Sequence, residues 1–177
     1  VAAIRLQEMV GKENIIMWAK KLGVSAKIRP ERSLSLGTQS ISLIEMTNAY
    51  ATIASEGIVP FIYGVESITD RNNNILYSRE SSLRTPSINK DTLNSIRVLL
   101  KASMDYGTSV NAKLSYLDNK NVLYGGKTGT TQSSKDAWFI GYLGNIIIGI
   151  WVGKDDNTGV KNLSGGNQAA KIYREIT

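Results

Sequence analysis

The segment from residue 124 to 152 constrains the fold more than any other part of the chain. Tyr124 to Thr131 is a glycine-rich, β-prone run, and two apolar runs follow it, Ala137 to Leu143 and Ile146 to Val152. Gly144-Asn145, between the last two runs, is a two-residue hairpin signal. Consecutive strands with short connections pair antiparallel, so this segment predicts a three-stranded antiparallel meander.

The third of these runs carries a second indication. Ile146 to Val152 is apolar at nearly every position and does not alternate with polar residues. Such a pattern is typical of a strand that is covered on both faces, so we expect a central strand here.

Helical patterns dominate the chain before this segment. Ser42 and Glu45, three residues apart, predict a capping box at the start of a largely apolar helix. Helices are predicted over Val1 to Val10, around Ile15 to Leu22 before Gly23, from Ser42 to near Gly57, and over Leu93 to Leu100 before Gly107. Glycine just after a periodic run is a common helix stop.

The remaining elements complete the fold class. Residues 58–79 contain short β-prone runs around the turn signal Asp70-Arg71-Asn72-Asn73. Ala169, Ile172, Tyr173 and Ile176 have the spacing of an amphipathic closing helix. Together these patterns predict an α/β fold in the loose sense (α+β): a helical half, then the antiparallel meander, then a C-terminal helix.

Composition excludes several kinds of chemistry. The 177 residues include no Cys and no His, so thiolate nucleophiles, cysteine zinc sites and Ser-His-Asp catalysis are excluded within this chain. The net charge of +6 is spread along the chain without a basic block interleaved with aromatics, so no nucleic-acid partner is expected. Asp155-Asp156 is interpreted as a solvated turn, and neither a metal nor a cofactor is predicted.

Gly125 to Thr131 is the segment with the strongest chemical signal. Its three glycines weaken a strand, and their usual reason is close approach by a ligand or another backbone. Lys127 and the hydroxyls of three threonines are suited to holding a carboxylate. If the strand lies at a sheet edge, its free N–H and C=O groups could also pair with an extended peptide. The alternative is a bulged strand with a solvated lysine and surface threonines.

Several blocks around this segment resemble the class A, bifunctional penicillin-binding proteins. A Lys-Thr-Gly element belongs to the signature of penicillin-binding proteins and β-lactamases. The blocks that follow the family's order are Leu36-Gly37-Thr38, Ser42 to Met46, Ala49 to Thr52, Gly107-Thr108, Lys127 to Thr131, Asp136 to Phe139, Gly141-Tyr142 and Trp151 to Asp156. The resemblance covers essentially the whole chain. It implies an incomplete transpeptidase fold of the penicillin-binding-protein and β-lactamase type.

The resemblance also implies roles for individual residues. Lys127 would lie beside the nucleophile and assist proton transfer, and Thr128 and Thr130 would hold the terminal carboxylate of the substrate. The Thr130 N–H would be one of two oxyanion-hole donors. Gly129 would let the substrate pass close to the strand. The catalytic candidates are therefore Lys127 and Thr130, and the substrate-binding candidates are Thr128, Gly129 and Thr130.

In the family the Ser-x-x-Lys and Ser-x-Asn motifs lie upstream of the region that this chain resembles. Two stretches imitate them: Ser87 to Lys90 fits Ser-x-x-Lys, and both Ser87 to Asn89 and Ser109 to Asn111 fit Ser-x-Asn. Neither matches a family position. Ser87 is interpreted as a turn and cap element before a helix, and Ser109 as a residue after a helix stop. The nucleophile is therefore expected outside this chain.

Two further features are interpreted as structural. Trp18, Trp138 and Trp151 are expected to anchor cores. Gly165-Gly166 could form an anion-binding nest at a helix N-terminus, but a flexible connection into the closing helix is favoured.

The expected function is a fragment of a penicillin-sensitive serine D,D-transpeptidase that cross-links peptidoglycan stem peptides through an acyl-enzyme, inactive alone. Residues 1–177 would be the C-terminal portion of one transpeptidase domain, with 58–86 a β-hairpin insertion and 122–177 the sheet and closing helix. The alternatives are a β-lactamase or D,D-carboxypeptidase relative, or a non-catalytic wall-binding module.

The resemblance also implies partners and a location. The partners would be stem peptides and, in the intact domain, β-lactams. The parent protein would be anchored in the inner membrane, with this domain in the periplasm or outside the cell. Because the family's next strand would come from the missing part, residues 146–152 would have an open edge, and a homodimer through it is expected.

Overall fold

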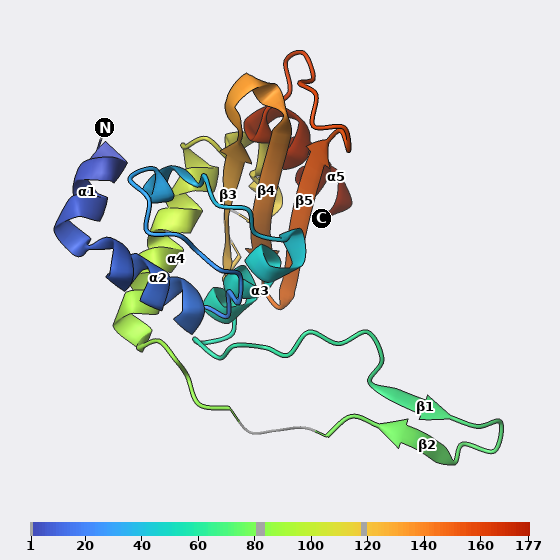
Figure 1. Cartoon of the computed structure of the whole chain (residues 1–177). Helices are drawn as coiled ribbons and strands as arrows, with labels where there is room; N and C mark the ends of the chain where they lie inside the picture. Colours follow the sequence, from blue (N-terminus) through green and yellow to red (C-terminus); the bar gives the residue numbers. More distant parts are fainter. Residues whose placement is uncertain (1, 81–83, 118–119) are drawn as a thin grey trace.

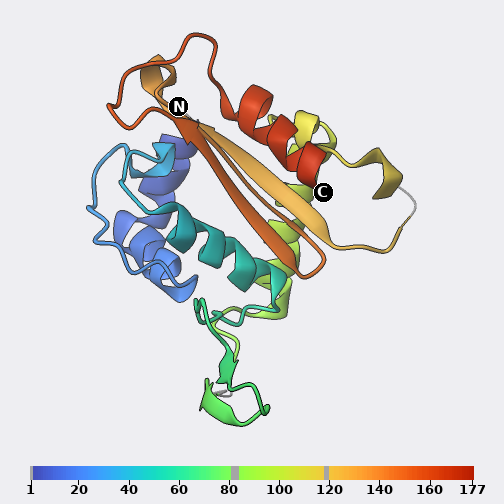
Figure 2. The same ribbon diagram turned by 90° about the vertical axis from the view of Figure 1, so that its right-hand side faces the viewer.

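A three-stranded sheet with helices on both of its faces forms the body of the molecule (Figures 1 and 2). The computed structural model describes residues 2–80, 84–117 and 120–177. Its elements are α1 (Ala2–Val10), α2 (Lys12–Lys21), η1 (Leu34–Leu36), α3 (Leu43–Ala54), β1 (Ser67–Thr69), β2 (Ile75–Ser78), α4 (Lys90–Asp105), η2 (Val110–Ala112), η3 (Ser115–Leu117), β3 (Tyr124–Thr130), η4 (Gln132–Ser134), β4 (Asp136–Leu143), β5 (Ile146–Gly153), η5 (Gly165–Ala169) and α5 (Ala170–Ile176). The predicted α+β class, with helices before an antiparallel meander and a closing helix, is confirmed.

The sheet has the order β3-β4-β5, and both of its strand pairs are antiparallel. Gly144, whose φ of 58° is left-handed, makes the predicted turn between β4 and β5. Within the described ranges β5 is an edge strand, so the central position suggested by its apolar pattern is wrong for this chain, whereas the open edge expected for residues 146–152 is confirmed. The apolar residues of β5 agree with its packing, because helices contact both faces of the strand and partly cover it. The polarity of side chains does not indicate whether the backbone of a strand pairs on one side or on both.

The main core lies on the face of the sheet that α5 covers. Phe139 and Tyr173, both fully buried, have ring centroids 4.6 Å apart. The buried cluster around them comprises Met104, Ala112, Leu114, Leu117, Tyr124, Ala169 and Ala170. The core aromatics are thus phenylalanine and tyrosine. The expectation for the tryptophans is wrong, since Trp18 and Trp138 are only half-buried and Trp151 is exposed.

Helices α3 and α4 pack on the opposite face. A side chain on Gly149 would collide with Thr47 of α3, so this glycine permits the close approach of α3 to β5. Helix α4 packs against β3, and Asn89 begins it by accepting a hydrogen bond of 2.8 Å from the Thr92 N–H. Asn89, and not Ser87, is therefore the cap of α4. The Ser87 hydroxyl instead donates to the carbonyls of Lys21 and Gly57.

The predicted capping box at α3 is only half formed. Ser42 Oγ accepts from the Glu45 N–H at 3.3 Å, but the Glu45 carboxylate does not return to the Ser42 N–H. It accepts from the Ser42 hydroxyl and from the backbone N–H groups of Ser25 and Ala26. Hydrogen bonds from the Ser25 and Ser42 side chains hold the pKa of Glu45 down at about 2. Glu45 therefore attaches the 25–26 segment to the start of α3.

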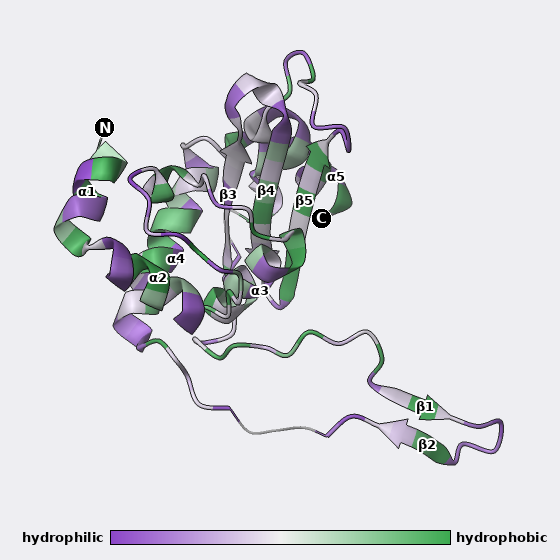
Figure 3. Cartoon of the chain, in the orientation of Figure 1, coloured by the Kyte–Doolittle hydropathy of each residue, from purple (hydrophilic) through white to green (hydrophobic). Residues whose placement is uncertain are grey.

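Strands β1 and β2 form a hairpin that projects from the body (Figure 1). The predicted turn at Asp70 is confirmed: its carboxylate accepts from the N–H groups of Asn72 and Asn74. The side chains on both strands are exposed, and Figure 3 shows hydrophobic segments along them. Of the range predicted as an insertion, residues 81–83 lie outside the described residues, as does Val1 of the first helix. In the described ranges no helix combines the length and hydropathy that a membrane span requires.

Arg97 joins α3 to α4 through a nearly buried guanidinium. Its Nε and Nη2 donate to the Ile53 carbonyl at 2.9 and 2.7 Å, and Nη2 also donates to the Ala54 carbonyl at 3.2 Å. Its Nη1 lies 2.9 Å from Oε1 of the largely exposed Glu56. The carbonyls at the end of a helix have no intrahelical partner, so Arg97 satisfies the C-terminus of α3.

We predict that Arg97→Met lowers the free energy of unfolding by about 2–4 kcal/mol, because it leaves helix-end carbonyls without a donor in a nearly buried place. The matched variant Glu56→Gln removes only an exposed ionic partner and should cost less than about 1 kcal/mol. Urea unfolding followed by circular dichroism measures both. Equal losses in the two variants would contradict the role assigned to the carbonyl contacts.

Candidate active site

A cavity of about 350 Å³ lies between β3 and the segment that precedes α3. Its walls come from four parts of the chain: the 34–41 segment, α3, β3 and β4. The lining residues are Leu34, Leu36, Gly37, Gln39, Ile41, Met46, Tyr50, Lys127 to Thr131, Trp138 and Ile140. All four predicted site residues therefore lie on one cavity, whereas Ser87 does not line it.

The Lys127 ammonium lies at the open edge of β3. Its Nζ donates to Thr108 Oγ1 and to the Thr128 carbonyl, both at 2.9 Å. The Thr128 hydroxyl also donates to Thr108 Oγ1, at 2.8 Å. Burial lowers the pKa of Lys127 below its ordinary value, because removing water disfavours the charged form. A lysine with a lowered pKa is better suited to exchange a proton near neutral pH.

The edge of β3 is only partly free for pairing with a peptide. In an antiparallel ladder alternate residues face the partner strand, and the Thr131 N–H faces β4 by donating to the Asp136 carbonyl at 3.1 Å. Thr128 and Thr130 therefore face outward. The Thr128 N–H donates to the Ser109 hydroxyl at 3.2 Å, and its carbonyl accepts from Lys127. Among the described residues the Thr130 N–H has no partner. An extended peptide could therefore pair with the edge of β3 only at Thr130.

The Thr130 hydroxyl is oriented by the segment before α5. The Gly165 N–H donates to Thr130 Oγ1 at 3.0 Å, which leaves the hydroxyl proton of Thr130 available to a ligand. A Cβ on Gly165 would lie 2.4 Å from the carbonyl oxygens of Gly129 and Trp138, so only glycine allows this contact. The interpretation of Gly165-Gly166 as a flexible connection is wrong, because residues 165–169 form a π-helical turn. This turn packs against β3 and β4.

Gly129 faces the cavity beside Trp138. A Cβ on Gly129 would lie 3.2 Å from the Trp138 Cβ and would narrow the space next to the strand. This position is compatible with a substrate that passes close to the backbone, which is the role implied for Gly129.

The far wall of the cavity depends on Gln7, a side chain that is only 2% exposed. Its amide nitrogen donates to the carbonyls of Glu31 and Arg32, and its oxygen accepts from the Ser35 N–H at 2.7 Å. The 31–35 segment is therefore held against α1. This fixes Leu34 and Leu36 opposite β3.

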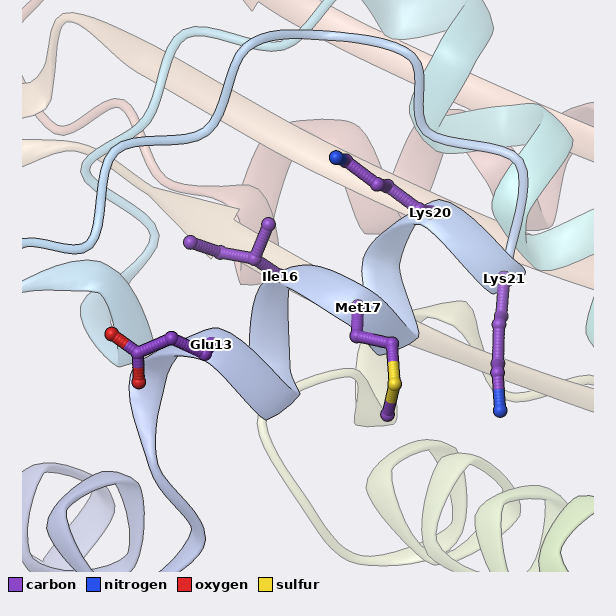
Figure 4. Close-up of a pocket in the computed structure, with 5 residues that line it drawn as sticks. All are labelled: Glu13, Ile16, Met17, Lys20 and Lys21. Carbon is purple, nitrogen blue, oxygen red and sulfur yellow. The ribbon is translucent and has the colours of Figure 1, made fainter.

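A second hollow, of about 540 Å³, lies along α2 (Figure 4). It is the larger of the two, but its lining is one face of a single helix: Glu13, Ile16, Met17, Lys20 and Lys21. These side chains spread along the helix and do not converge on one point (Figure 4). The cavity at β3 is the better candidate because its polar groups do converge.

Three residues of the site escaped the sequence reasoning: Thr108, Gly165 and Gln7. In the sequence Thr108 stands out only as part of a Gly-Thr pair, 19 residues before Lys127. Gln7 carries no local signal, because a buried glutamine looks like any helical glutamine in sequence. Ser109, which the sequence indicates only as a residue after a helix stop, is fully buried. Its hydroxyl shares a hydrogen bond with the Ser103 hydroxyl and accepts from the Thr128 N–H.

Curated relatives match nearly all of the chain. Penicillin-binding protein 1B of Haemophilus influenzae is 28% identical over 176 residues, which are 99% of this chain and 22% of that protein. Penicillin-binding protein 1A of Aquifex aeolicus is 32% identical over 173 residues, 97% of this chain and 23% of that protein. The chain thus spans less than a quarter of these relatives.

Solved structures share the fold. Penicillin-binding protein 1A from Haemophilus influenzae superposes with a TM-score of 0.85 at 22% identity, over 99% of this chain and 32% of that one. PonA1 from Mycobacterium tuberculosis, in complex with penicillin V, superposes with a TM-score of 0.79 at 22% identity, over 97% of this chain and 50% of that one.

The family model for the penicillin binding protein transpeptidase domain matches residues 1–177. This match agrees with the resemblance seen in the sequence and with the shared fold. The chain therefore belongs to the penicillin-binding protein transpeptidase family.

Proposed function

We propose that this chain forms one wall of the active site of a serine D,D-transpeptidase that cross-links peptidoglycan stem peptides. The observation that carries the proposal is the edge of β3, where the Lys127 ammonium, the Thr130 hydroxyl and the outward-facing Thr130 N–H lie on one cavity. Charged and hydroxyl donors in a row suit the terminal carboxylate of a stem peptide. Membership of the transpeptidase family supports the assignment.

In the proposed reaction a serine oxygen attacks the carbonyl carbon of the penultimate D-alanine. The terminal D-alanine leaves as an amine after taking up a proton, and the acyl group remains on serine as an ester. An amine of a second stem peptide attacks this ester, forms the cross-link and returns the serine hydroxyl. The Thr130 N–H donates to the oxyanion of each addition step, a contribution of about 3 kcal/mol for one well-placed donor.

The side chains of β3 divide the remaining tasks. Lys127 and the hydroxyls of Thr128 and Thr130 bind the substrate carboxylate, and Lys127 assists proton transfer at the nucleophile. The Thr128 hydroxyl donates to Thr108 in this structure, so it must reorient to donate to a substrate. The Thr130 hydroxyl already accepts from Gly165 and can donate without rearrangement.

We place the nucleophilic serine outside residues 1–177. Ser109 is fully buried, and the Ser87 hydroxyl is engaged by the carbonyls of Lys21 and Gly57. Residues 1–177 would be the C-terminal portion of one transpeptidase domain, with 58–86 a hairpin insertion and 122–177 the sheet and closing helix. The share of PonA1 that this chain covers, 50%, is compatible with that arrangement.

The setting of the proposed enzyme is the cell envelope. The parent protein would be anchored in the inner membrane by a segment outside this chain, with the domain in the periplasm or outside the cell. β-Lactams would acylate the same serine. The names of the relatives and the penicillin V complex of PonA1 support the proposed binding of β-lactams.

Fluorescent penicillin tests the placement of the nucleophile. We predict covalent labelling of a polypeptide that carries this chain together with upstream sequence, and no labelling of the 177-residue chain, because the acylated serine lies upstream. Gel fluorescence after denaturation measures it. Stable labelling of the 177-residue chain would place the nucleophile within it, and an unlabelled longer polypeptide would favour a non-catalytic module.

Thr130→Val in the longer polypeptide should slow acylation by penicillin about 30-fold, the equivalent of about 2 kcal/mol for a lost hydrogen bond to a charged group. Thr130→Ser keeps the hydroxyl and should stay within about threefold of the wild type. Stopped-flow measurement of the acylation rate, alongside the unfolding midpoint, separates loss of binding from loss of folding. Equal rates for the valine and serine variants would rule out a role for the hydroxyl.

We also propose that copies of the 177-residue chain associate through the outer edge of β5. Ile146 is 55% and Trp151 37% exposed on this strand, and an unpaired hydrophobic edge is a template for pairing.

Sedimentation velocity should show a dimer or larger species. Ile146→Lys should weaken association by placing a charge at the edge, whereas the matched variant Ile75→Lys, on the hairpin, should not. A monodisperse wild-type monomer at high concentration would disprove it.

A further inference from the structure

Thr108 occupies a position at the site that its place in the sequence does not suggest. It lies in the short connection between α4 and η2, yet its hydroxyl contacts two side chains of β3. Thr108 Oγ1 accepts from Lys127 Nζ at 2.9 Å and from the Thr128 hydroxyl at 2.8 Å. One oxygen therefore joins the ammonium and the hydroxyl that face a substrate.

The backbone around Thr108 is held from both sides. The N–H groups of Gly107 and Ser109 both donate to the Ser103 carbonyl, at 3.1 and 3.0 Å, which ties the connection to the last turn of α4. On the other side, a Cβ on Gly166 would lie 2.9 Å from the Thr108 carbonyl oxygen. The adjacent Ser109 accepts from the Thr128 N–H and is fully buried. Thr108 is thus fixed relative to β3 independently of its own hydroxyl.

A lysine ammonium needs such a partner to be well oriented. It is a compact charge on a flexible four-carbon stem, with three donors and no acceptor. Lys127 Nζ donates to Thr108 Oγ1 and to the Thr128 carbonyl, both at 2.9 Å, and makes a longer contact of 3.4 Å to Thr128 Oγ1. The long contact is the weakest of the three, so it is the one that a substrate acceptor can replace. Without Thr108 the ammonium would keep only partners on its own strand.

We propose that Thr108 is a positioning residue for the acyl transfer: its hydroxyl holds the Lys127 ammonium at the edge of β3, and it holds the Thr128 hydroxyl until that group turns to a substrate. The proposal rests on the proposed function, since it concerns the same site. Thr108 acts through these two side chains and is assigned no contact with the reacting atoms.

The test compares Thr108→Val with Thr108→Ser in the polypeptide that includes upstream sequence. Valine keeps the shape but removes the acceptor, so acylation by penicillin should slow about 10- to 100-fold, as expected for a misplaced catalytic group. Serine keeps the acceptor and should recover to within about threefold of the wild type. A hydrogen bond to the charged form favours it, so the Lys127 pKa should fall in the valine variant and its limb of the pH–rate profile should move to lower pH.

Thr52→Val is the control for the loss of a structural threonine hydroxyl. The Thr52 hydroxyl donates to the carbonyls of Leu22 and Asn48, and its hydrogen bonds join it to neither Lys127 nor Thr128. Thr52 is fully buried, whereas Thr108 is exposed, so any loss of stability should be larger in Thr52→Val. This variant should lower the unfolding midpoint without moving the pH–rate profile. A merely structural role for Thr108 would give the same pattern as Thr52→Val and would overturn the proposal.

A second readout separates the two proposals. The lysine ε-carbons of the same polypeptide are labelled with ¹³C, and the Lys127 signal is assigned by its loss in Lys127→Arg. A lower titration midpoint of Lys127 in Thr108→Val than in Thr108→Ser supports the contact between Thr108 and Lys127, whether or not the wild type is acylated. If the wild type is not acylated, only the proposed function is contradicted. Acylation of the wild type with an unchanged rate, pH profile and titration in Thr108→Val would refute the positioning role.

Discussion

The antiparallel ladder between β3 and β4 is the interaction on which the rest of the structure depends. Strand β3 is rich in glycine and offers few side chains for packing, so its position is set by backbone hydrogen bonds to β4. That ladder uses one side of β3 and turns the N–H groups of Thr128 and Thr130 outward. The proposed site depends on which of these outward-facing N–H groups already have a hydrogen-bond partner in the fold.

Elements from three parts of the fold hold the groups that surround the edge of β3. Ser109, after α4, takes the Thr128 N–H, and Gly165, before α5, donates to the Thr130 hydroxyl. Gln7 holds the opposite wall of the cavity from α1. Arg97 in turn ties α4 to the end of α3, so the connection that carries Thr108 and Ser109 starts from a fixed helix. The Thr130 N–H is left open because no neighbouring element reaches it among the described residues.

Much of this could be predicted from local patterns. The hairpin at Gly144, the turn at Asp70 and the helix before Gly107 each follow from residues adjacent in sequence, and each is present. The errors have a common cause. Ser42 and Glu45 have the spacing of a capping box, but Ser25 and Ala26 compete for the same carboxylate. The Gly165 segment looked flexible because its packing partners, Gly129 and Trp138, are distant in sequence.

The sequence by itself determined the chemical character of this protein: Lys127, Thr128 and Thr130 on a glycine-rich strand, no histidine or cysteine, and blocks that identify the transpeptidase family. Those are properties of residue type and spacing, which folding does not alter. Only the tertiary structure decided that β3 is an edge strand among the described residues, that Thr128 is already engaged, and that Thr108 and Gly165 belong to the site. Hydrogen bonds between residues 19 to 35 positions apart leave no periodic trace along the chain, so they become visible only when the backbone brings the partners together.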